Sequence, residues 1–175
     1  IPCGLCFALA GALLVLYPVD GFVKLGQRFV EQGTLFCFLF AYGSYLGPRL
    51  IHGRSSEEID RTAPSTTQWV PVLVAGTLAI TFLVESSWSE QIGRLARALV
   101  VTVYAFRIVP ILRLPIHRFS AWTLWTGFWC LLLGQWLAGL FPDYEIVALH
   151  LTFIGGFSTI TIVIATRVIS AHRGP

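Results

Sequence analysis

Long apolar segments recur along almost the whole chain and constrain its fold more than any other feature. A helix needs about 20 mostly apolar residues to cross a bilayer. A sliding hydropathy window finds six such segments, at roughly 3–19, 33–51, 69–84, 95–114, 121–141 and 145–168. Only 12% of the 175 residues are charged, about half the share in a soluble domain. The sequence therefore predicts an all-α fold, a multi-pass transmembrane helical bundle of about six spans.

The alternative, that these segments are buried helices of a soluble bundle, would require six helices of this low polarity in one chain. The connecting segments are short, and the longest, at 52–68, mixes both charge signs with turn-forming residues. The turn "FPDYE" after residue 140 predicts an antiparallel hairpin of the last two spans. We therefore expect residues 1–175 to form a single transmembrane helical domain.

Basic residues set the expected orientation, because cytoplasmic loops are enriched in them. The loops on the side of the termini hold seven basic residues, and the opposite loops hold Lys24, Arg28, Arg94 and Arg97. This bias places both termini in the cytoplasm. The chain has no methionine and no charged region before its first apolar segment, so that segment does not read as a signal peptide. We expect the sequence to be part of a longer protein.

Polar groups inside apolar spans are costly and therefore informative. Arg107 lies within the fourth predicted span and requires a partner, a water-filled cavity or a route to the interface. Cys3 and Cys6 form "CGLC" in the first span and read as two buried thiols, and Cys37 and Cys130 read as core residues. The chain shows no P-loop, no Ser/His/Asp constellation and no concentrated basic patch for nucleic acid, so the sequence assigns no hydrolytic activity.

The four histidines are the strongest candidates for a metal site, because neutral imidazole is a common metal and haem ligand. By the expected topology, His52, His117 and His172 lie at one membrane face, and His150 enters the last span from the other. His150 and His172 are 22 residues apart, about 33 Å along a continuous helix. They therefore belong to two separate locations and cannot share one metal unless the helix breaks.

The closing stretch resembles the NnrS family, bacterial multi-pass membrane proteins of the nitric oxide response. The resemblance rests on Ala148-Leu149-His150, the pair Gly155–Gly156, Thr166-Arg167-Val168 and His172, and it is clearest over residues 115–174. Ala171 stands where the family usually has glycine, and "HRGP" only approximates the usual ending.

The resemblance implies an inner-membrane protein that holds haem and copper through histidines and takes part in the response to nitrosative stress. His150 and His172 are then the candidate metal ligands, with Arg167 at a helix end or beside a haem propionate. Arg107, His117 and His52 are weaker candidates for cofactor binding.

Three activities stay open within that family: sensing, metal-centred chemistry on nitric oxide, and metal handling. Two other classes of protein compete with it. A transporter or channel would use the in-span glycines and Arg107 as parts of a substrate path. A structural or assembly subunit would leave the histidines solvated.

Overall fold

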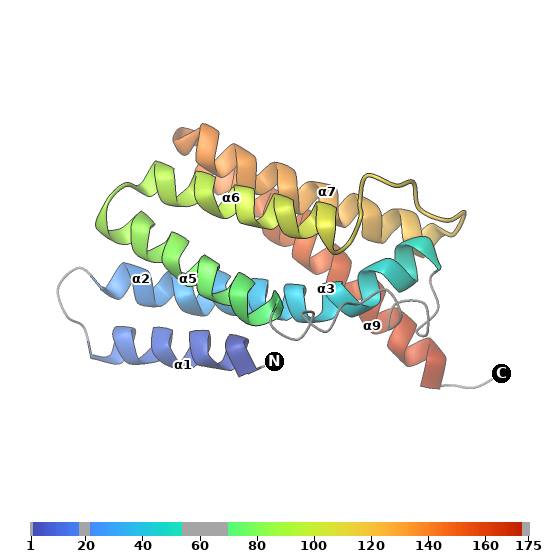
Figure 1. Ribbon diagram of the computed structural model, residues 1–175, viewed down its shortest axis with the longest axis horizontal. Coiled ribbons are helices and arrows are strands. Elements are labelled where there is room, and N and C mark those ends of the chain that lie inside the picture. The colour runs from blue at the N-terminus through green and yellow to red at the C-terminus, as the bar shows by residue number, and fades with distance from the viewer. Residues whose placement is uncertain (1, 18–21, 54–69, 173–175) are drawn as a thin grey trace.

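The computed structural model describes residues 2–17, 22–53 and 70–172, and within these ranges every regular element is helical (Figure 1). The predicted all-α class is therefore confirmed. The elements are α1 (Pro2–Leu16), α2 (Val23–Arg28), the π-helix η1 (Phe29–Gly33), α3 (Thr34–His52), α5 (Val70–Ser87), α6 (Glu90–Arg107), α7 (Phe119–Leu140), the 3-10 turn η3 (Pro142–Tyr144), α8 (Glu145–His150), the π-helix η4 (Leu151–Ser158) and α9 (Thr159–His172).

Short elements join into longer helices, because their junctions keep helical backbone angles. Arg28 and Gly33 lie at α-helical angles on either side of η1, so α2, η1 and α3 follow one another without a turn. The same holds for α8, η4 and α9. Helix α1 packs along the α2–η1–α3 helix, and α5 packs against α6. Helix α7 contacts both α6 and the α8–η4–α9 helix (Figure 1).

The core between these helices is built from aromatic and aliphatic side chains. Phe36, Phe82 and Phe128 are almost fully buried, and the hydroxyl of the buried Tyr104 donates to the carbonyl oxygen of Phe40 at 2.8 Å. The outward faces are apolar as well: Leu73 is 67% exposed and Ile162 is 65% exposed. A soluble monomer rarely exposes so much contiguous apolar surface, so this bundle is suited to an apolar environment.

One helix in the described part of the chain, Pro142–Ser170, is long and apolar enough by itself to cross a membrane. Two apolar helical stretches, Cys3–Leu16 and Val72–Ser87, are shorter. Helix length and composition thus agree with a membrane protein but do not establish six spans. The six-span topology and the orientation of the termini stay predictions.

The fourth helix begins and ends earlier than the predicted span 95–114. It begins at Glu90, because the hydroxyl of Ser89 caps it by accepting from the amide of Ile92. It ends at Arg107, and Pro110 lies in the following segment, where a proline cannot continue a helix. That segment returns to α3, with the amide of Ile116 donating to the Ile51 carbonyl at 2.9 Å.

The cysteines differ in part from expectation. Cys37 is buried and Cys3 and Cys130 are half-buried, but Cys6 is exposed on α1. The prediction of two buried thiols in "CGLC" is therefore wrong for Cys6, because this position faces away from α3. Most of the predicted connector 52–68 lies outside the described residues.

Candidate functional site

His150 is the last residue of α8 and lies directly before η4. Its ring is exposed on the outer side of the helix, and Nδ1 lies 2.7 Å from the carbonyl oxygen of Ile146. Because a carbonyl oxygen only accepts, Nδ1 is the donor in this contact, and in the neutral ring Nε2 is then the nitrogen with a lone pair for a ligand. A backbone carbonyl that fixes one ring nitrogen is the usual support of a metal-bound imidazole.

The segment after His150 is wound more widely than an α-helix. Eight residues, Leu151–Ser158, form the π-helix η4, and the hydroxyl of Ser158 donates to the carbonyl of Phe153, five residues back. Such π segments are often found at functional positions. The glycine pair Gly155–Gly156 lies inside it, and the helix continues into α9 without a break. His150 and His172 therefore lie at opposite ends of one continuous helical path.

A buried carboxylate, Glu85, lies near the end of α5 and holds three guanidinium groups. Its Oε1 lies 2.7 Å from Nη1 of Arg28 and 3.1 Å from Nε of Arg94, and its Oε2 lies 2.6 Å from Nη1 of Arg97. The Glu85 side chain is 1% exposed, and those of Arg94 and Arg97 are 4% and 3% exposed. We call these four residues the Glu85 cluster. It joins α2, α5 and α6.

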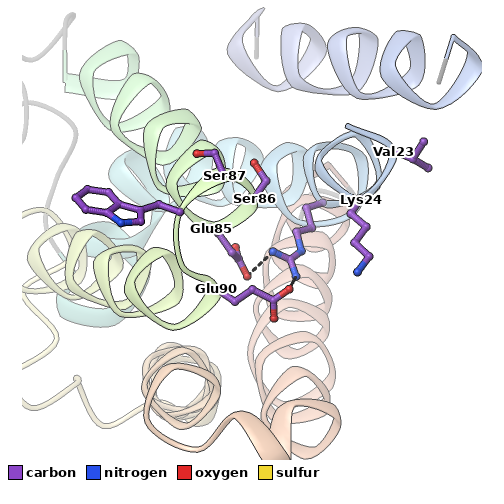
Figure 2. Close-up of a pocket in the computed structure, with 8 residues that line it drawn as sticks. Val23, Lys24, Glu85, Ser86, Ser87 and Glu90 are labelled. Carbon is purple, nitrogen blue, oxygen red and sulfur yellow. Dashed lines mark ion pairs between the residues drawn. The ribbon is translucent and has the colours of Figure 1, made fainter. Parts of the chain in front are cut away.

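Two carboxylates at the edge of the cluster complete its charge balance. Arg94 donates through Nη2 to Glu145 at 2.9 Å and to Glu90 at 3.3 Å. Figure 2 shows Glu85 and Glu90 directed at the same guanidinium, which belongs to Arg28, with Lys24 on its far side. These side chains line an open cavity of about 540 Å³ at this end of the bundle.

Hydrogen bonds connect the Glu85 cluster to the helix that carries His150. Nε of Arg97 donates to Oε1 of Gln135 at 3.2 Å, and Nε2 of Gln135 donates to Oγ1 of Thr152 at 3.3 Å. The Thr152 hydroxyl donates in turn to the carbonyl of Ala148 at 3.0 Å. Gln135 and Thr152 are buried. The cluster and the backbone around His150 are therefore parts of one polar network.

The sequence did not predict this network. The prediction that Arg28, Arg94 and Arg97 lie in loops is wrong, because Arg28 lies in α2 and the buried Arg94 and Arg97 lie in α6. Arg94 and Arg97 are three residues apart and so share one face of a helix. The three-residue spacing of these arginines, together with the acidic Glu85 at the end of the third predicted span, was the signal in the sequence that could have indicated the network.

The other predicted site residues are dispersed. His117 is exposed, His52 is half-buried at the end of α3, and Arg107 is exposed at the end of α6. Arg167 is half-buried in α9 and donates to the hydroxyl of Ser120. The backbone of His172 ends α9, and its side chain lies outside the described residues. Arg167 is 17 residues beyond His150, about 25 Å along the helix, so it does not join His150 in one site.

The arrangement at His150 fits a single imidazole ligand. Among the residues that the structure describes, no group of three or more His, Cys, Asp or Glu side chains is placed to hold a metal ion. His150 therefore offers one imidazole nitrogen to a ligand. The described side chains alone do not supply a complete copper centre.

Comparison with known proteins gives one family. The family model described as "NnrS protein" matches residues 1–175, which is the whole chain. No curated protein matches the sequence. No solved structure matches it either.

Proposed function

The chain belongs to the NnrS family, and from this premise we propose that it is an integral membrane protein of the bacterial inner membrane that acts in the response to nitric oxide. The whole-chain family match is the observation that carries this proposal. The apolar outer faces of the helices and the long helix Pro142–Ser170 support the membrane location.

Exposed aromatic residues at both ends of the bundle support the same location, because tryptophan and other amphipathic rings prefer the membrane–water interface. Trp88 is 83% exposed in the turn between α5 and α6. Trp122 is 40% exposed near the start of α7, at the opposite end of that bundle. In this proposal α1, α3, α5, α6, α7 and the α8–η4–α9 helix are the six spans, with both termini in the cytoplasm.

Haem and copper are the proposed cofactors, with His150 and His172 as ligands at separate locations. His150 would hold haem iron through Nε2, and the Ile146 carbonyl would keep the ring in the required tautomer. Bound haem would supply an iron centre at which nitric oxide can coordinate. Thr152 and Gln135 would fix the backbone that carries His150 through the network described above.

Replacing the exposed ring of His150 with alanine tests this assignment. We expect His150→Ala to lose most of the haem absorption band, because the substitution removes the imidazole nitrogen that would hold the haem iron. The measurement is the optical spectrum and haem content of protein purified in detergent. Tyr144→Ala is the matched control, since Tyr144 is also an exposed ring and lies directly before α8. Wild-type haem content in His150→Ala would remove His150 from the site.

A further inference from the structure

Three arginines from separate parts of the chain line one cavity at the other end of the bundle. Arg49 belongs to the last turn of α3, Arg118 directly precedes α7, and Arg167 belongs to α9. They border a cavity of about 580 Å³, a size within the range of small-molecule sites. Figure 1 shows the end of α3, the start of α7 and α9 gathered at this end. We call this cavity the arginine cavity.

No carboxylate among the described side chains pairs with the three arginines of the arginine cavity. Arg49 donates to the hydroxyl of Tyr45 at 2.6 Å and Arg167 donates to Ser120, which are both neutral groups. In the described ranges, the ion pairs all lie in and around the Glu85 cluster and none includes these three arginines. Three like charges that share a cavity repel one another, so an anion bound between them is favoured.

Arg118 provides a second, independent indication. It is the N-cap residue of α7, a helix of 22 residues, and its guanidinium, which has only donors, cannot accept from the amides of the first turn. The positive end of the helix dipole disfavours a cation at this position and favours an anion. Arg49, by contrast, lies at the negative end of α3, where the dipole favours it. The position of Arg118 is therefore explained by a ligand better than by its own helix.

The remaining walls of the arginine cavity are mostly apolar. Leu46, Leu50, Ile164 and Val168 line it beside the arginines, together with Gly53 and Ser170. A site that combines guanidinium groups with an apolar wall suits an amphiphile with a charged head and a hydrocarbon tail. Basic pockets between membrane helices bind lipid headgroups in this manner.

We infer that the arginine cavity binds a phosphate-bearing anion, presented as the headgroup of an anionic phospholipid. The phosphate oxygens accept from Arg49, Arg118 and Arg167, and the acyl chain lies along the leucine and isoleucine wall. This site is separate from His150 and does not depend on the proposed haem.

Lipid binding to Arg118→Gln, measured by native mass spectrometry of the whole protein in detergent, tests the inference. We expect wild-type protein to bind phosphatidylglycerol more tightly than phosphatidylcholine, and diacylglycerol of the same chains not at all. Arg118→Gln weakens phosphatidylglycerol binding about fivefold, the contribution of one basic residue at a membrane surface. Arg113→Gln is the matched control, because Arg113 is exposed in the same connecting segment but does not line the cavity.

A second arm adds inorganic phosphate. Competition by millimolar phosphate identifies the free anion as a sufficient ligand, whereas no competition assigns binding to the lipid headgroup, and both results support the site.

The melting temperature without lipid reports folding. Arg118→Gln should not lower it, because the substitution removes an unfavourable charge at the start of a helix. Equal phosphatidylglycerol affinity in Arg118→Gln, Arg113→Gln and wild type would overturn the inference. Diacylglycerol binding as tight as that of phosphatidylglycerol would also overturn the inference. So would an Arg118→Gln variant that loses haem but keeps its affinity for phosphatidylglycerol.

Discussion

Glu85→Ala is expected to destabilise the protein more than any other single charge change. It leaves Arg28, Arg94 and Arg97 without the buried carboxylate that all three contact. Removing one partner of a buried ion pair costs about 3–5 kcal/mol, because the remaining charge stays buried and uncompensated. For a chain of this size each kcal/mol lowers the melting temperature by about 2–4 °C, so the expected loss is about 6–20 °C. Thermal unfolding in detergent, followed by circular dichroism, measures it.

Glu90→Gln is the matched control for that change. Glu90 also contacts Arg28 and Arg94, but its side chain is 58% exposed. Exposed ion pairs contribute about 0–1 kcal/mol, so the melting temperature should fall by only a few degrees. If the two variants had the same melting temperature, Glu85 would contribute no more to stability than a surface carboxylate does.

Gly134→Ala is expected to disrupt the contact between α7 and the helix that carries His150. A Cβ atom at Gly134 would clash with the Thr152 hydroxyl and approach the Ala148 carbonyl oxygen to 2.7 Å and the Thr152 amide nitrogen to 2.8 Å. Two of these atoms belong to the backbone, so the helices must separate. Overpacking of this kind costs about 1–3 kcal/mol. We expect a fall of several degrees in melting temperature together with a lower haem content.

Gly76→Ala separates this steric effect from a general effect of replacing a helical glycine. No atom lies within 4 Å of a Cβ atom built at Gly76, and alanine is the better helix former by about 1 kcal/mol. The melting temperature of Gly76→Ala should therefore stay level or rise. A fall as large as that of Gly134→Ala would contradict the close approach described for α7.

The helices were predictable because each is marked by a local apolar run. The helix found at Thr34–His52 corresponds to the predicted span 33–51, and that at Phe119–Leu140 to the predicted 121–141. The predicted bounds of the fourth helix were wrong at its start, because that start depends on the cap by Ser89. A hydropathy window does not detect a helix cap. The charged first turns of α6 lower the local hydropathy, although the buried arginines there form ion pairs with Glu85.

The candidate site was predictable only where its signal was local. His150 was selected as one imidazole near the start of an apolar run. It lies directly before η4, and its role as a ligand stays a prediction. The Glu85 cluster escaped prediction because its contacts join residues far apart in the chain: Arg94 and Glu145 are separated by 51 positions. The arginine cavity was not predicted either, because its residues are also far apart in the chain. A sequence lists its basic residues but does not show that Arg49, Arg118 and Arg167 converge.

The central proposal is that this NnrS-family chain is a membrane protein that binds haem and copper and responds to nitric oxide. Metal analysis and an optical spectrum of the wild-type protein, extracted from membranes in detergent, test this proposal. We expect bound iron and copper, a haem absorption band, and a shift of that band when nitric oxide is added to the reduced protein. Protein that is folded by circular dichroism but contains neither metal, or whose haem band does not respond to nitric oxide, would contradict it.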